Sequence, residues 1–234
     1  TSWEALCSEA EKLVDGKTYT VYFYTDVTVT DETQCAQLQN GTVTLDLGGH
    51  NIKSGRSGTL FEIAGGAVTI ENGTLTGNDK GYVLDVTGGS LRLENTLKIL
   101  WENTLYGCNL RTYGGETIIN GTDMQSVMYV DGGTVTILDG SFEGISHKSG
   151  TLNLKGGSYD MSRHAAPYDG MSVQMSGALR DLLAEGYGFR RLEDDGSASD
   201  WILEETALNG NKFDYAVKVE QLPELSITQQ PEDK

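Results

Sequence analysis

The chain of 234 residues contains little proline and little cysteine, three residues of each. Cys7, Cys35 and Cys108 are odd in number and lack CxxC or other metal-ligand spacing, which gives no support for a metal site. A single bridge between Cys7 and Cys35 and a set of buried thiols are both compatible with this pattern. No apolar run approaches the ~20 residues that span a bilayer, and no signal peptide is present, so we expect no membrane insertion.

Basic residues are also scarce, since 17 Lys and Arg face 34 Asp and Glu for a net charge of −17. Such a field repels phosphate backbones, so we expect neither a nucleic-acid nor an anionic-membrane partner. An acidic polysaccharide is repelled in the same way unless a cation bridges it to the protein. The charge is equally explained by solubility alone.

Glycine, in contrast, is abundant and periodic, with 30 residues. A short pattern, a glycine pair or its equivalent followed by alternating apolar residues, occurs six times. The copies are residues 40–45 (NGTVTL), 65–70 (GGAVTI), 88–93 (GGSLRL), 114–119 (GGETII), 132–137 (GGTVTI) and 149–154 (SGTLNL). A turn-plus-strand unit that recurs every ~20 residues is typical of a solenoid, whose units bury their apolar faces by stacking.

Equivalent positions in these copies are nearly all apolar. The third place after the first glycine holds Val68, Leu91, Thr117, Val135 and Leu152, and the fifth holds Ile70, Leu93, Ile119, Ile137 and Leu154. The tenth place holds Leu75, Lys98, Met124, Phe142 and Tyr159, where Lys98 suggests a one-residue slip to Leu97. Because side chains alternate along a strand, this pattern predicts one continuous interior ladder.

The two ends of the chain differ from the repeats. Residues 1–17 predict an N-terminal capping helix over residues 1–14, with Thr1 and Glu4 as a capping box. Residues 18–165 are expected to form the repeats, and residues 166–222 a C-terminal cap made of a helix at 177–186 and a hairpin turning at 194–196. Residues 223–234 are expected to be a linker.

Residues 44–52 (TLDLGGHNI), the GGTVTI copies and the opening SWEAL resemble the pectin-lyase-like superfamily. The resemblance covers about residues 1–160 and implies an all-β fold, a right-handed parallel β-helix. It also implies a large secreted or wall-attached protein of Gram-positive gut bacteria. Residues 226–233 look like the first strand of a truncated immunoglobulin-like repeat. Because the sequence starts at Thr1 without methionine, we expect a piece of a longer chain. We expect this module to be monomeric.

Three places before the glycines, an outward row contains Glu62, Asp85, Arg111, Tyr129 and Ser146. Stacked strands lie about 4.8 Å apart, so Glu62 and Asp85 would form a carboxylate pair suited to Ca²⁺ or to one carboxyl group with a raised pKa. With Arg111 on the next strand, the column is similar to a lyase site. The alternative is a solvated strand face on which Asp85 and Arg111 form a weak ion pair.

Aromatic residues supply a second set of candidates. Aromatic rings stack on sugar C–H groups and asparagine binds hydroxyls, so a longer insertion near residue 101 predicts a glycan-binding surface. The candidates are Trp101, Asn103, Tyr106, Tyr113 and Tyr129. The alternative is that Trp101 packs against the side of the stack.

The leading hypothesis is a non-catalytic, extracellular module that acts as an adhesive surface or spacer, with glycans or a cell-surface protein as partner. The second is a polysaccharide lyase or glycoside hydrolase that works along the column of Glu62, Asp85 and Arg111. The third is a purely structural spacer. No cofactor is expected, with Ca²⁺ as the one candidate.

Overall fold

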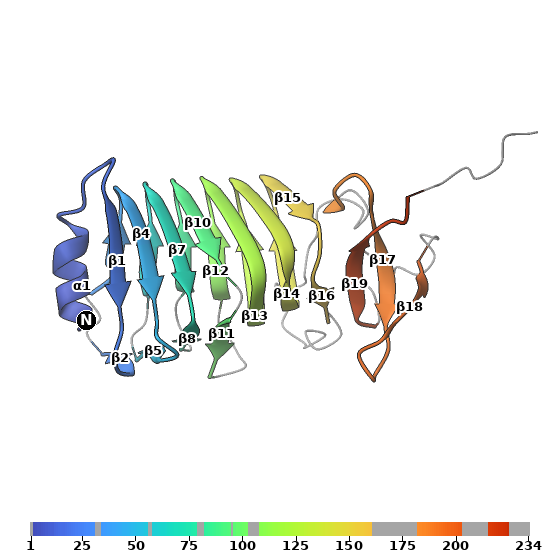
Figure 1. Ribbon diagram of the computed structural model, residues 1–234, viewed down its shortest axis with the longest axis horizontal. Coiled ribbons are helices and arrows are strands. Elements are labelled where there is room, and N and C mark those ends of the chain that lie inside the picture. The colour runs from blue at the N-terminus through green and yellow to red at the C-terminus, as the bar shows by residue number, and fades with distance from the viewer. Residues whose placement is uncertain are drawn as a thin grey trace, which may run out of the picture.

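The computed structural model describes residues 2–30, 34–55, 58–78, 82–94, 96–102, 108–160, 182–202 and 215–224. This part of the chain is mostly β-strand, with one short helix and one large, mostly parallel sheet, so the expected all-β class is confirmed. The helix lies at one end of the stacked strands and three antiparallel strands lie at the other (Figure 1).

The strands form three rows, and the chain visits the rows in turn. Row 1 contains β1 and the strands that follow the glycine pattern. Its members are β1 (Thr18–Tyr22), β4 (Thr42–Asp46), β7 (Ala67–Glu71), β10 (Ser90–Leu93), the first parts of β13 (Glu116–Val130) and β14 (Thr134–His147), and β15 (Thr151–Leu154).

One pass of the chain is one strand in each row, so every row 1 strand is followed along the sequence by a segment of row 2 and, in most passes, by one of row 3. Row 2 consists of β2 (Val27–Val29), β5 (Asn51–Ser54), β8 (Gly73–Gly77), β11 (Leu97–Trp101), the middle parts of β13 and β14, and β16 (Ser158–Tyr159). Row 3 consists of β3 (Ala36–Leu38), β6 (Phe61–Ile63), β9 (Tyr82–Val86), β12 (Cys108–Thr112) and the last parts of β13 and β14. Every pairing within the three rows is parallel.

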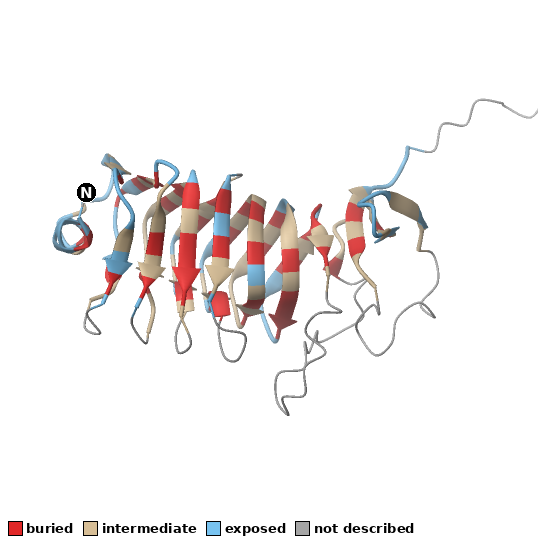
Figure 2. Cartoon of the chain, turned by 90° about the horizontal axis from the view of Figure 1, so that it is seen from below, coloured by how far each residue is buried: buried red, intermediate tan, exposed pale blue. Residues whose placement is uncertain are grey.

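The pairing register agrees with the glycine pattern. In row 1, Val68 pairs with Leu91, and the pairing continues through Thr117 and Val135 to Leu152. These inward residues are buried, and they alternate along the strands with less buried outward ones (Figure 2). Because polar and apolar positions repeat at the same place in each pass, the apolar side chains form one continuous core.

The sequence pattern shifts the inward position from Lys98 back to Leu97, whereas in the structure it is shifted forward to Ile99. Ile99, not Leu97, pairs with Leu75 on one side and with Met124 on the other. The turn before β11 contains one extra residue, and Thr96 adopts a positive φ of 77° there. The longer turn moves the apolar residue one place forward along the chain, so Ile99 keeps its inward position.

The N-terminal helix is shorter than the expected range of residues 1–14. Helix α1 covers Trp3–Ala10, and the N-cap is Ser2 rather than Thr1, because the Ser2 hydroxyl accepts a hydrogen bond from the backbone N–H of Ala5 at 3.2 Å. The Trp3 ring packs edge-on against Phe61, with ring centroids 5.1 Å apart. Val14, the last residue of the expected helix, lies beyond α1 and is 55% exposed.

The C-terminal region contains the expected hairpin. Strands β17 (Tyr187–Leu192) and β18 (Ala198–Trp201) are antiparallel, and β19 (Val217–Gln221) pairs antiparallel with both β17 and β16. Residues 161–181 and 225–234 lie outside the described residues, and with them the first half of the predicted helix and the expected immunoglobulin-like start. The described residues 182–186 form turns and a bridge instead of an α-helix.

The glycine turns permit close contact between successive passes. A Cβ at Gly132 would lie 2.3 Å from the carbonyl oxygen of Tyr113, so one of the two backbone segments would have to shift. We therefore expect Gly132→Ala to lower the free energy of unfolding by about 1–3 kcal/mol. Gly196→Asn is the control, because Gly196 has a positive φ that asparagine tolerates and open space around it. Equal denaturation midpoints for the two variants would contradict the register.

Candidate functional site

Row 3 brings the predicted acidic and basic residues together on its outward face. Glu62 pairs with Asp85, Asp85 with Arg111, and Arg111 with Tyr129 in direct register. Their neighbours along the strands point inward and are buried, as Phe61 shows on β6. The alternation of side chains along each strand therefore places residues about 20 positions apart in the sequence beside one another.

Arg111 does not form the predicted ion pair with Asp85. Its Nε lies 3.3 Å from Oδ2 of Asp131, and its Nη1 donates a hydrogen bond to the Tyr82 hydroxyl at 2.7 Å. The guanidinium carbon also lies 4.8 Å from the ring centroid of Tyr82 and 4.0 Å from that of Tyr113. Two aromatic rings and a carboxylate thus hold the cation, which is 25% exposed.

Asp85 and Glu62 are placed differently although their backbones pair. Burial raises the pKa of the Asp85 carboxyl, and the nearby Arg111 charge offsets part of this effect. The Oδ1 atom of Asp85 is covered and has no hydrogen-bond partner. Glu62 instead accepts a hydrogen bond from Nε2 of Gln37 at 3.0 Å. The two carboxyl groups therefore differ in environment: Asp85 is partly buried beside Arg111, whereas Glu62 is hydrogen-bonded to Gln37.

Two tyrosines of the predicted glycan set border this column. Tyr113 is 42% exposed, and Tyr129 is half-buried with Nζ of Lys148 lying 5.7 Å from its ring centroid. Burial raises the pKa of the Tyr129 phenol to about 12, so this hydroxyl keeps its proton at neutral pH. Lys148 also lies 3.7 Å from Oδ1 of Asp131, which therefore contacts both cations.

We call these side chains the row 3 patch: Glu62, Tyr82, Asp85, Arg111, Tyr113, Tyr129, Asp131 and Lys148. Sequence reasoning missed Tyr82, Asp131 and Lys148. The sequence pattern could have identified two of them, because Asp131 lies two places after Tyr129 and Lys148 two places after Ser146, both members of the predicted outward row. Residues two apart on a strand share a face, so the same alternation extends the column into the following turn.

The remaining glycan candidates lie elsewhere. Trp101 ends β11 in row 2, and its ring covers Gly77, where an added Cβ would lie 2.1 Å from Cζ3 of the indole. Its Nε1 is buried without a hydrogen-bond partner, in agreement with packing against the stack rather than with an open sugar platform. Asn103 and Tyr106 lie outside the described residues.

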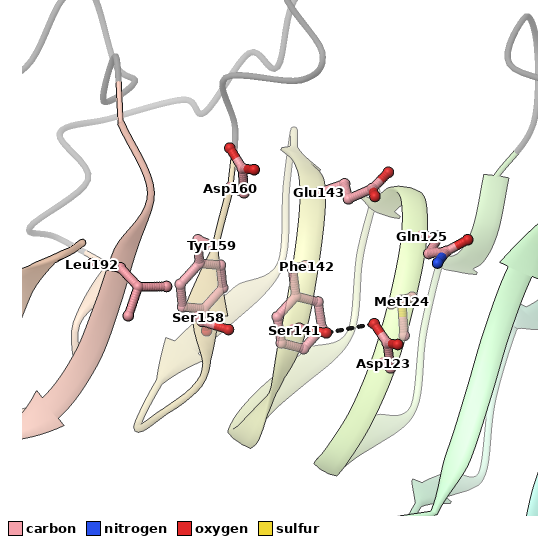
Figure 3. A pocket seen from close by; sticks show the side chains of 10 residues that line it. All are labelled: Asp123, Met124, Gln125, Ser141, Phe142, Glu143, Ser158, Tyr159, Asp160 and Leu192. Atoms are coloured by element: carbon pink, nitrogen blue, oxygen red, sulfur yellow. Dashed lines mark hydrogen bonds between the residues drawn. The ribbon is translucent and has the colours of Figure 1, made fainter. Parts of the chain in front are cut away.

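A hollow of about 210 Å³ lies beside β13, β14, β16 and β17 (Figure 3). Phe142 and Tyr159 are stacked at 5.2 Å next to it, and Ser141 donates a hydrogen bond to Asp123 at its edge. Its volume is below the ~300 Å³ at which pockets for small-molecule ligands typically begin. A second hollow, of about 370 Å³, lies beside α1 and β2, so volume alone does not select a site. We consider the row 3 patch the better candidate because it brings two cations, three carboxyl groups and an exposed aromatic ring together.

Other classes of site receive little support from the described residues. Within these ranges, no group of three or more His, Cys, Asp or Glu is arranged to hold a metal ion. Cys7, Cys35 and Cys108 are thiols rather than disulfides, and burial raises the pKa of the Cys108 thiol. Helix α1 has eight residues, and the described chain contains no helix with the length and apolar character to cross a membrane.

Comparison with known proteins finds no match for this chain among family models, curated proteins or solved structures.

The environment of Asp85 predicts a pH-dependent stability effect. Because its pKa is raised in the folded state, folding becomes less favourable as pH rises through that value. Asp85→Asn should therefore raise the melting temperature at pH 7 by on the order of 1 °C, and the difference should vanish near pH 3, measured by circular dichroism.

Asp26→Asn provides the opposite control. The backbone N–H of Asn51 and the ring of His50 lower the pKa of Asp26, so its charge stabilises the fold above the pKa of the unfolded chain. This variant should lower the melting temperature at pH 7, with a smaller effect in acid. A lower melting temperature for Asp85→Asn at pH 7 would contradict the assigned environment.

Proposed function

We propose that this chain is a right-handed parallel β-helix of the pectin-lyase-like kind that binds glycans at the row 3 patch without catalysing a reaction. The three rows of parallel strands and the glycine pattern support the β-helix. The proposed setting is a secreted or wall-attached bacterial protein, in which the chain serves as a monomeric, adhesive module.

The observation that carries the proposal is the exposed Tyr113 ring above a set of ordered polar groups. Sugar-binding surfaces combine an aromatic face for C–H contacts with a few placed hydrogen-bonding groups. Arg111 stacks on Tyr113 and limits its rotation, so the ring loses little conformational entropy on binding. Glu62 and Lys148 supply an acceptor and a donor on the same row.

A second candidate is a polysaccharide lyase or glycoside hydrolase. It is favoured by the raised pKa of Asp85 beside the Glu62 carboxyl group, because paired carboxyl groups in different environments can act as acid and base. Arg111, the basic residue of this lyase-like column, is however held by Asp131 and Tyr82.

The same column does not fit a calcium-dependent enzyme. Ca²⁺ takes six to eight oxygen ligands, whereas Glu62 and Asp85 supply two carboxyl groups. Glu62 is also bonded to Gln37. No step of the proposed function therefore involves a metal ion.

Tyr113→Ala tests the glycan proposal. The variant should lose about tenfold or more in affinity for the glycans that the unmodified chain binds on a glycan array, because the stacking surface is removed. Tyr24→Ala is the matched control, since Tyr24 is 73% exposed but follows β1, and its binding should be unchanged.

Two results would contradict the proposal. Binding that survives Tyr113→Ala would place the ligand elsewhere. Release of reducing ends from a polysaccharide, abolished in Glu62→Gln, would favour the second candidate and exclude a non-catalytic module.

A further inference from the structure

We propose that the row 3 patch binds neutral sugar chains and discriminates against chains that carry carboxylate or sulfate groups. This inference rests on the proposed glycan binding and names the class of ligand. It follows from the way in which the cations and carboxylates of the patch are paired.

Both cations of the patch share a carboxylate of the protein. Arg111 Nε lies 3.3 Å from Oδ2 of Asp131, and Lys148 Nζ lies 3.7 Å from Oδ1. Asp131 is 15% exposed, so its charge is poorly screened by water and acts strongly on both neighbours. An acidic sugar would have to compete with this preformed carboxylate for either cation.

Arg111 is further restricted by its aromatic neighbours. Its Nη1 donates to the Tyr82 hydroxyl, and the rings of Tyr82 and Tyr113 lie at 4.8 and 4.0 Å from the guanidinium carbon. The two-pronged geometry with which arginine grips a carboxylate requires two N–H groups on one edge. Here Nε–H and one N–H of Nη1 already have partners within the protein, so the fork that uses the Nε edge is occupied and an acidic sugar is limited to the Nη1/Nη2 end.

The net charge of the patch also disfavours acidic sugars. Glu62, Asp85 and Asp131 carry three negative charges when ionised, and Arg111 and Lys148 carry two positive ones, which leaves a net charge of −1. A proton on Asp85 brings the sum to zero. The patch is never net positive at neutral pH, and the whole chain has a net charge of −17. An anionic ligand therefore meets repulsion both near the patch and far from it.

A neutral sugar meets groups suited to it. The exposed Tyr113 ring offers an apolar face, the Glu62 carboxylate accepts hydrogen bonds from hydroxyls, and Lys148, 59% exposed, donates to ring or hydroxyl oxygens. These residues lie on or directly after neighbouring strands of row 3, from β6 to β14. A sugar chain that runs across the strands can therefore contact them one after another.

The test compares matched glycan pairs on the same array and by calorimetry. The probes are lactose-series chains with and without terminal sialic acid, and neutral galactan fragments against polygalacturonate fragments of equal length. We expect the neutral member of each bound pair to bind at least about fivefold more tightly, as one like-charge repulsion at the surface would produce.

Asp131→Asn should weaken this discrimination, because it releases both cations. We expect the neutral-over-acidic ratio to fall about two- to fivefold, the effect of one exposed ion pair. Asp194→Asn is the control: it removes one negative charge from an exposed turn and should leave the ratio unchanged. If Asp131→Asn does not fold, Lys148→Gln replaces it, and this more acidic patch should widen the discrimination.

The outcomes distinguish failure of the neutral-sugar preference from failure of glycan binding itself. Binding that depends on Tyr113 but favours the acidic member overturns the neutral-sugar inference and leaves the glycan-binding function intact. No binding to any probe, or binding unaffected by Tyr113→Ala, overturns the function itself and the inference with it. An equal fall in the ratio for Asp131→Asn and Asp194→Asn assigns the discrimination to overall charge and contradicts the role of the patch.

Discussion

The structure depends on parallel pairing in which each strand is in register with the strand one pass earlier. Backbone groups of the inner passes find partners on both sides, so each strand needs its neighbours to satisfy its hydrogen bonds. The same pairing aligns inward positions, which must then be apolar in nearly every pass. The recurring glycine turns follow from this constraint, because a side chain at Gly132 would collide with the pass before it.

The candidate site is a product of the same register. Arg111 and Asp131 are 20 positions apart in the sequence, and Lys148 follows 17 positions later, yet all three are in contact because their strands stack. The outward face is free of the packing that determines the inward one, so its charges and rings can vary without loss of the fold. In the row 3 patch two cations share one carboxylate, and the proposed preference for neutral sugars rests on that arrangement.

Much of the fold could be predicted from the sequence, but the side-chain partners could not. The apolar ladder and the pairing of Glu62, Asp85 and Arg111 follow from position alone, because alternation and repeat length determine them. The choice of Asp131 over Asp85 as the partner of Arg111 depends on rotamers and on two aromatic rings. Leu97 was assigned to the inward position that Ile99 occupies, because one extra residue in a turn leaves no trace in an alternating pattern. The N-cap was misplaced because Thr1 and Ser2 are both favourable capping residues.

Cysteine cross-linking tests the register most directly. In a background with alanine at Cys7, Cys35 and Cys108, cysteines at Thr44 and Thr69 occupy directly paired outward positions, about 5 Å apart and within disulfide reach. Cysteines at Thr44 and Ala67 share the same face but are two places out of register, roughly 8 Å apart. The account predicts rapid oxidation of the Thr44/Thr69 pair and little of the Thr44/Ala67 pair. Equal or faster cross-linking of the Thr44/Ala67 pair would contradict it.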